Sequence, residues 1–202
     1  MEKRNWKHIV TLKQRMVLCL AAFFAAFALQ LALNGYQARA VQQVQDDQMG
    51  NFNAISRFQG GVESSISILE AYRWENGETE EMLEKLQAAC STSNAWLWRI
   101  RSNMDGLQNV SDEQWVLYGA VETTYGSYNT LLEELESYLS SGQEAKASQL
   151  YYNKVSVCGG YLSQYTMQLL KASILDAQTT YTEISELGER IALMQTVVVA
   201  LC

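Results

Sequence analysis

The most constraining feature of this sequence is an absence: its 202 residues contain no proline. Average usage of about 5% would give roughly ten. Proline interrupts helices because it lacks a backbone N–H and clashes with the preceding turn. A chain without it favours long uninterrupted helices and disfavours turn-rich sandwiches and barrels, so we predict an all-α fold.

An apolar segment, MVLCLAAFFAAFALQLAL, runs from Met16 to Leu33 with a single polar interruption at Gln30. As a helix it would be about 27 Å long, close to the ~30 Å hydrocarbon core of a bilayer. We therefore predict a transmembrane helix over residues 16–34. A cleavable signal peptide is the alternative, with Ala38-Arg39-Ala40 as its cleavage site, although the run is longer than usual for a signal peptide.

The two flanks of this segment differ in charge. Arg39 is the single basic residue between Asn34 and Gly50, whereas residues 1–15 hold five: Lys3, Arg4, Lys7, Lys13 and Arg15. Positive charge concentrates on the cytoplasmic side of membrane helices. We expect residues 1–15 to form a cytoplasmic tail of a cell-membrane protein, with membrane lipid as a partner, and the central domain to be extracellular.

The last twelve residues, IALMQTVVVALC, are apolar from Ile191 to Cys202. They would reach about 18 Å as a helix, which is too short to cross a bilayer. They are either the buried end of a helix or the start of a second transmembrane helix, truncated at residue 202. The sequence favours the second interpretation for residues 191–202.

The stretch from Asn34 to Arg190 is acidic, with 21 Asp and Glu against 10 Lys and Arg. Nucleic-acid binding needs a basic surface, so we expect no nucleic-acid partner. One histidine, His8, and four scattered cysteines are too few ligands for a zinc or haem site. We expect no metal and no cofactor, and we assign no catalytic residue.

Apolar positions spaced three and four residues apart recur in four consecutive stretches of residues 35–190, which is typical of bundled helices. We predict helices over 36–73, 79–105, 112–140 and 143–190, with Asn76-Gly77, Asp105-Gly106 and Ser140-Ser141-Gly142 between them. Ser111 with Gln114 is predicted to cap the third helix, and Ser141 with Glu144 the fourth. Short connections make neighbours antiparallel. The predicted core positions include Ile55, Phe58 and Leu69; Leu83, Leu86 and Leu97; Trp115, Tyr118 and Glu122; Tyr151, Val155 and Leu162.

The predicted fold is thus an antiparallel four-helix bundle whose first and last helices continue into transmembrane helices. These two helices are longer than the others, so the bundle would stand on a two-helix stalk. The lower stalk, YQARAVQQVQDDQ, has Val41 and Val44 alone on its inner face. So narrow an apolar stripe buries little, and we expect a homodimer to complete the stalk.

This layout of basic tail, membrane helix, outer helical bundle and second membrane helix resembles the sensory half of bacterial two-transmembrane receptors. The resembling families are the sensor histidine kinases of two-component systems and the methyl-accepting chemotaxis receptors. The resemblance implies a signal-transduction receptor that relays an extracellular cue by helix displacement, with the kinase preferred. Whether the full-length protein is an enzyme stays open, because the sequence lacks a phosphoacceptor or ATP-binding motif. A non-signalling, membrane-anchored helical binding protein is the alternative, as is a secreted protein released after Ala40.

The smallest residues of the four predicted helices fall at one height in the bundle: Gly60-Gly61, Cys90, Gly126 and Cys158-Gly159-Gly160. They would either let the helices approach closely, act as hinges, or leave a ligand cavity. Arg99 and Arg101 could hold a carboxylate, or lie in solvent with local ion pairs. A disulfide between Cys90 and Cys158 is possible. The candidate ligand-binding residues are Trp96, Trp98, Arg99, Arg101, Tyr125, Tyr128 and Tyr161.

Overall fold

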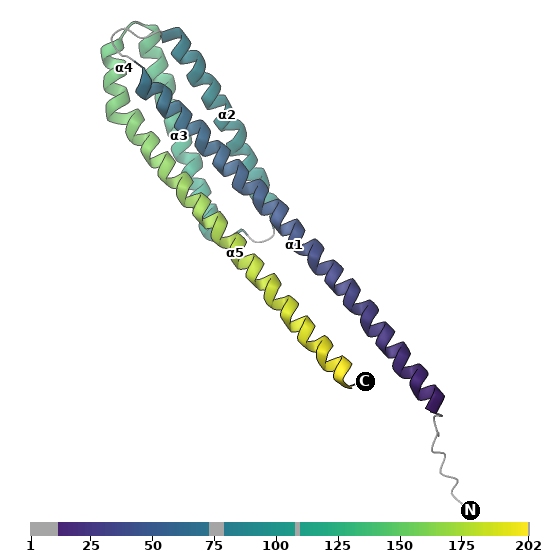
Figure 1. Cartoon of the computed structure of the whole chain (residues 1–202). Coiled ribbons are helices and arrows are strands. Elements are labelled where there is room, and N and C mark those ends of the chain that lie inside the picture. Colours follow the sequence, from purple (N-terminus) through teal and green to yellow (C-terminus); the bar gives the residue numbers. More distant parts are fainter. Residues whose placement is uncertain (1–11, 73–78, 108–109, 202) are drawn as a thin grey trace, which may run out of the picture. The chain divides into compact units, whose positions relative to one another are not determined.

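The computed structural model describes residues 12–72, 79–107 and 110–201. Within these ranges the regular elements are all helices, and the predicted all-α class is confirmed. The predicted turn at Asn76-Gly77 lies outside the described residues. The elements, shown in Figure 1, are α1 (Leu12–Ala71), α2 (Thr79–Gly106), α3 (Asp112–Ser140), α4 (Glu144–Leu150), the π-helix η1 (Tyr151–Val155) and α5 (Ser156–Leu201).

The chain divides into two compact units. The central unit is Val44–Thr180, and the terminal unit consists of the described parts of Met1–Gln43 and Tyr181–Cys202. Both boundaries fall inside the stretch 35–190 that the sequence suggests as one domain. Helices α1 and α5 each contribute residues to both units.

The central unit has one hydrophobic core, to which each of its helices contributes. Its helices lie side by side in Figure 1, and side-chain contacts join them. The Tyr128 hydroxyl of α3 lies 3.0 Å from the Ser65 Oγ of α1, and the Tyr125 hydroxyl donates to the Cys90 carbonyl of α2 at 2.8 Å. This packing is consistent with a helical bundle. The largest fully buried side chains include Tyr128, Phe58, Ile55, Leu69, Ile100, Met104, Leu135, Leu162 and Leu169.

Most predicted core positions are buried, but at several of them the structure buries an adjacent residue more deeply. The structure buries Met82 more deeply than Leu83, and Gln114 more deeply than Trp115. It also buries Val121 where the prediction has Glu122. At about 100° per residue, Val121 lies within the arc of α3 that the buried residues Gln114, Tyr118 and Tyr128 share, whereas Glu122 lies outside that arc. Glu122 stays in solvent, where its carboxylate accepts a hydrogen bond from the Tyr118 hydroxyl at 3.1 Å.

Of the two hydrogen bonds of the capping box predicted at the start of α3, one is formed. The Ser111 Oγ accepts the Gln114 backbone N–H at 3.3 Å, as an N-cap does. The reciprocal bond of a capping box is missing, because the Ser111 N–H donates to the Asp176 Oδ2 of α5 at 3.1 Å. The Gln114 side chain turns into the core instead. A residue 65 positions away therefore completes this cap.

The turn between α3 and α4 also corrects a prediction. Ser141 caps the end of α3, where its Oγ donates to the Ser137 carbonyl at 2.7 Å, so it does not cap the following helix. Gln143 precedes α4 without a side-chain cap. Gly142 has φ +68, a left-handed conformation that glycine adopts without steric cost. The predicted break at Ser140-Ser141-Gly142 is confirmed.

The predicted fourth helix, 143–190, is not regular. The π-helix η1 interrupts it, and the Ser156 N–H donates to the Tyr151 carbonyl five residues earlier. The buried positions Ala147, Tyr151, Val155 and Gly159 are four residues apart. Steps of four overshoot a turn of 3.6 residues, and a wider π turn keeps these positions facing the core.

In the terminal unit, α1 contains the stretch Met16–Arg39, whose mean hydropathy is 2.4 and of which nothing is buried. By length and composition this stretch could span a membrane, and it is the one such stretch among the residues that the structure describes. Helix α5 approaches α1 at Gly188, where a Cβ would lie 3.2 Å from the Gln37 Nε2. The lack of a side chain at Gly188 therefore lets the two helices approach here.

Candidate functional site

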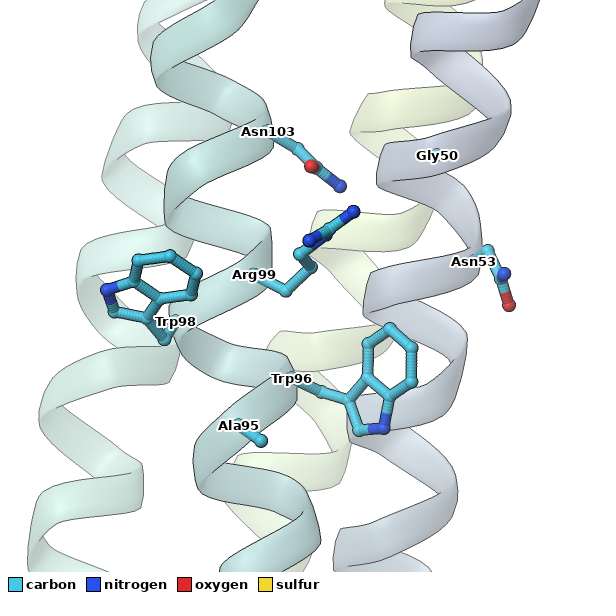
Figure 2. Close-up of a pocket in the computed structure, with 7 residues that line it drawn as sticks. All are labelled: Gly50, Asn53, Ala95, Trp96, Trp98, Arg99 and Asn103. Atoms are coloured by element: carbon cyan, nitrogen blue, oxygen red, sulfur yellow. The ribbon is translucent and has the colours of Figure 1, made fainter.

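Three polar and aromatic side chains form a stripe along one face of α2. Trp96, Arg99 and Asn103 are spaced three and four residues apart, so they share a face of the helix. Figure 2 shows all three extending from α2 toward α1, where Gly50 lies opposite Asn103. A Cβ on Gly50 would be 4.0 Å from the Asn103 Nδ2, so the two helices are close here.

Between α1 and α2 this stripe borders an open groove of about 600 Å³. The volume lies within the range of small-molecule sites, which run from about 300 to 1,000 Å³. Gly50 contributes to the groove by leaving out a side chain on the α1 side. The groove is lined by Gly50, Asn53, Ala95, Trp96, Trp98, Arg99 and Asn103.

The groove is electrostatically distinct from the acidic chain around it. Its lining contains one guanidinium, two side-chain amides and no carboxylate. Among the described residues, the ion pairs of the central unit join Lys85 to Glu81 and Arg101 to Asp105, and Arg99 is in neither. The groove is therefore a local positive site on a negatively charged domain.

Arg101 lies on a different face of α2 from Arg99. Its Nε is 3.4 Å from the Asp105 Oδ2, and its guanidinium lies 5.4 Å from the ring centre of Trp115 and 5.7 Å from that of Tyr118. The nearby Asp105 carboxylate raises the pKa of Arg101. Arg101 is thus engaged by neighbours on α2 and α3 and forms a local ion pair, one of the two roles predicted for it.

The three candidate tyrosines do not line the groove. Tyr125 and Tyr128 are buried in the core, and burial raises the pKa of Tyr125 to about 12 and raises that of Tyr128 further. The Ser65 hydroxyl donates to the Val62 carbonyl at 2.7 Å, so Tyr128 is the donor in its contact with Ser65. Tyr161 is 55% exposed on α5. The groove lining therefore includes Trp96, Trp98 and Arg99 but none of the other four candidates, and the Trp98 ring extends away from α1 in Figure 2.

The layer of small residues serves close packing at two of its positions. A Cβ on Gly61 would lie 2.4 Å from the Ser93 Oγ, and one on Gly159 would lie 3.0 Å from the Ile66 Cδ1. Gly60, Gly126 and Gly160 instead face open space. The space in front of Gly61 and Gly159 is thus occupied by neighbouring helices.

Cys90 and Cys158 are free thiols. Burial, and to a lesser extent the charge of Glu136, raises the pKa of Cys90 to about 11, and burial also raises the pKa of Cys158. The Cys158 Sγ donates to the Thr124 carbonyl at 3.7 Å. The geometry gives both thiols a packing role.

Two important lining residues are absent from the sequence-based candidates. Asn103 could have been found by extending the Trp96–Arg99 stripe by one helical turn. Gly50 gives no such signal, because its place opposite α2 depends on how the two helices pair. Within the described ranges, no group of His, Cys, Asp and Glu side chains is arranged to hold a metal ion.

Comparison of the chain with known protein families, with characterised proteins and with solved structures finds no match.

Proposed function

We propose that the chain is the sensory region of a membrane receptor, most specifically of a two-component sensor histidine kinase. In this proposal residues 1–15 are cytoplasmic, α1 crosses the cell membrane, and the central unit is an extracellular antiparallel four-helix bundle. Binding of a ligand or partner protein to the bundle displaces one membrane-connected helix relative to the other.

The observation that carries this proposal is the continuity of α1. It is a single helix from Leu12 to Ala71, so the apolar stretch Met16–Arg39 and the core residues Ile55, Phe58 and Leu69 belong to the same helix. Helices that move as rigid bodies shift by about 1–2 Å in known switching transitions. A continuous helix would carry such a shift from the bundle into the membrane.

The exposed surface of the apolar stretch supports the membrane assignment. Phe23, Phe24 and Leu29 are each more than half exposed along α1. In water this surface would be costly, whereas lipid would cover it at no such cost. The five basic residues before it favour a cytoplasmic N-terminus.

Polar contacts between α5 and its neighbours support the proposed movement. The Asn51 Nδ2 of α1 donates to the Ser173 Oγ at 3.3 Å, and Asp176 accepts at 3.1 Å from the N–H of Ser111, the residue that caps α3. The Asn51 Oδ1 is buried without a hydrogen-bond partner. A buried amide with a spare acceptor can exchange partners, so α5 could shift here by exchanging hydrogen bonds instead of opening an apolar cavity.

A homodimer is part of the proposal because the stalk buries little. The polar residues Gln37, Ser185 and Glu189 accompany Val41 and Ile184 around a groove between α1 and α5 in the terminal unit. A second copy would add the apolar contact that two such helices lack.

The orientation can be tested with single cysteines in the full chain, after the native cysteines are replaced by serine. Ser141→Cys, in the exposed turn after α3, is expected to react with a membrane-impermeant maleimide in intact bacterial cells. Glu2→Cys should react only after permeabilisation, because the basic tail is inside. The reverse pattern would overturn the orientation, and equal labelling of both before permeabilisation would overturn the membrane assignment.

The relay can be tested by joining residues 1–202 to the remainder of a second transmembrane helix and then to the cytoplasmic core of a histidine kinase, because residues 191–202 alone are too short to cross the bilayer. Inserting one residue between Arg190 and Ile191 rotates the following helix by about 100°. We expect autophosphorylation to change several-fold, whereas a seven-residue insertion, nearly two whole turns, should restore it. If neither insertion changes the level of autophosphorylation, the result would instead favour the non-signalling binding protein.

A further inference from the structure

The groove between α1 and α2 combines a cation, an aromatic surface and amide donors in one place. Arg99 supplies a guanidinium with five N–H donors, and no carboxylate in the lining neutralises it. The Trp96 indole comes from the same face of α2, one turn before Arg99. Asn103, one turn after Arg99, adds an amide that can donate two further hydrogen bonds.

This set of groups selects for charge and shape together. A guanidinium pairs best with a planar oxyanion, which it can hold through two parallel N–H···O bonds. An indole favours a flat apolar group against its face. The acidic residues of the surrounding surface would repel an anion everywhere except near such a cation, so the groove is a favoured point of approach.

The floor of the groove provides the space for the apolar part of a ligand. Gly50 is in the middle of α1, where a glycine costs about 1 kcal/mol relative to alanine. An alanine Cβ here would meet only the Asn103 Nδ2, at 4.0 Å, which is ordinary contact. Packing of the two helices therefore does not demand glycine at this position, and a side chain larger than alanine would extend into the groove.

We infer that this groove binds a small organic anion in which a carboxylate is attached to a flat apolar group. Arg99 holds the carboxylate with Asn103 beside it, and Trp96 packs against the apolar group. The inference goes beyond the proposed receptor role, because it concerns binding to the chain itself and would stand if the relay failed.

Phenylacetate is a suitable probe, with phenylacetamide as its uncharged counterpart of nearly the same shape. The full chain, labelled with ¹⁵N-tryptophan in a mild detergent, gives an indole N–H signal for each tryptophan in NMR spectra. Phenylacetate is expected to shift the Trp96 signal in a saturable way and to leave the Trp115 signal unmoved. If phenylacetamide shifts Trp96 equally, or if neither compound shifts it, the inference is overturned.

Two arginine variants separate the groove from the general charge of α2. Arg99→Gln should weaken phenylacetate binding at least about tenfold, because it removes a charge-assisted bidentate contact. Arg101→Gln makes the same change in charge two residues away and should change the affinity less than about twofold. Equal effects of the two variants would mean that nonspecific electrostatics attract the probe, and the inference would fail.

Two glycine variants test the space in the groove. Gly50→Leu fills the floor and should abolish the saturable shift of Trp96. Gly60→Leu adds the same side chain to the same helix where a Cβ meets nothing within 4 Å, so binding should persist. Circular dichroism of both variants controls for loss of helix. Undiminished binding to a folded Gly50→Leu variant would overturn the placement.

A comparison with a dipeptide tests whether the carboxylate bound in the groove belongs to a free small acid or to a peptide C-terminus. Gly-Phe carries its carboxylate beside an aromatic side chain at a chain end, and Gly-Phe-amide lacks that charge. Tighter binding of Gly-Phe than of phenylacetate would assign the groove to peptide C-termini, and weaker binding would assign it to free small acids. Binding of the amide as tight as that of Gly-Phe would contradict a carboxylate site.

Discussion

Replacing Phe58 with alanine is expected to lower the free energy of unfolding by about 3–5 kcal/mol, the usual cost of deleting a large buried aromatic side chain. Phe58 has no exposed surface, and its ring packs edge-on against Tyr125 with centres 5.2 Å apart. Tyr125 cannot readily move into the space, because its hydroxyl is bonded to the Cys90 carbonyl. The cavity would therefore stay open, and the free energy of unfolding would fall by the full cost of an unfilled cavity.

Urea unfolding of the full chain in mild detergent, followed by tryptophan fluorescence, measures this loss. Phe52→Ala is the matched control, since Phe52 is on the same helix but is 38% exposed. It should cost less than about 1 kcal/mol, in line with substitutions at partly exposed positions. Similar losses for the two variants would show that Phe58 is not at the centre of the core.

Alkaline pH is expected to destabilise the central unit, beginning near pH 9. Burial raises the pKa of Cys90 from 9.0 to about 11 and that of Tyr125 from 10.0 to about 12, and it raises that of Tyr128 further. In the unfolded chain these groups ionise at their ordinary pKa values, whereas in the folded chain they stay protonated. Unfolding then releases protons, so rising pH favours the unfolded state.

The sign and the range follow from these values. The stability contributed by the protonated groups is complete below pH 9 and is lost progressively as the pH rises above 9, with the loss due to Tyr128 continuing to the highest pH. Between its unfolded and folded pKa values, each buried tyrosine lowers the free energy of unfolding by about 1.4 kcal/mol per pH unit. Urea unfolding at a series of pH values, together with the absorbance of tyrosinate, measures both the loss and the groups responsible.

Two tyrosine variants assign the alkaline loss. Tyr128→Phe should cost about 1 kcal/mol at neutral pH, since it removes the hydrogen bond to Ser65, but it should flatten the decline above pH 10. Tyr161→Phe removes an exposed hydroxyl and should leave the pH profile unchanged. A profile that both variants flatten equally would show that burial of Tyr128 does not cause the decline.

The helices and most of the core were predictable from local patterns. Spacings of three and four, the absence of proline and the break at Gly142 act within one or two helical turns, so the sequence carries them directly. The errors at Val121 and Gln114 arise because steps of three and of four residues both stay on one helix face, so spacing alone leaves a choice between adjacent residues. The spacing pattern also does not predict the π turn at Tyr151–Val155, because only packing against the core determines which residues must face inward.

The candidate site was predictable only in part. Trp96, Trp98 and Arg99 stood out as aromatic and basic residues in an acidic chain, and all three contribute to the lining of one groove, although the Trp98 ring extends away from α1 (Figure 2). The structure separates Arg101 from them, although it is only two residues from Arg99, because a step of two residues along a helix changes the face.

The sequence by itself determined that the chain is helical, where most of its helices begin and end, and that one apolar stretch is long enough to cross a membrane. Only the tertiary structure decided that Gly50 faces the Trp96–Arg99–Asn103 stripe, that Asp176 completes the cap at Ser111, and that Ser93 fills the space at Gly61. The physical reason is the separation in sequence between the residues that interact. Helix formation depends on neighbours within a few residues, whereas these contacts join residues tens of positions apart, and they exist only once the helices have paired.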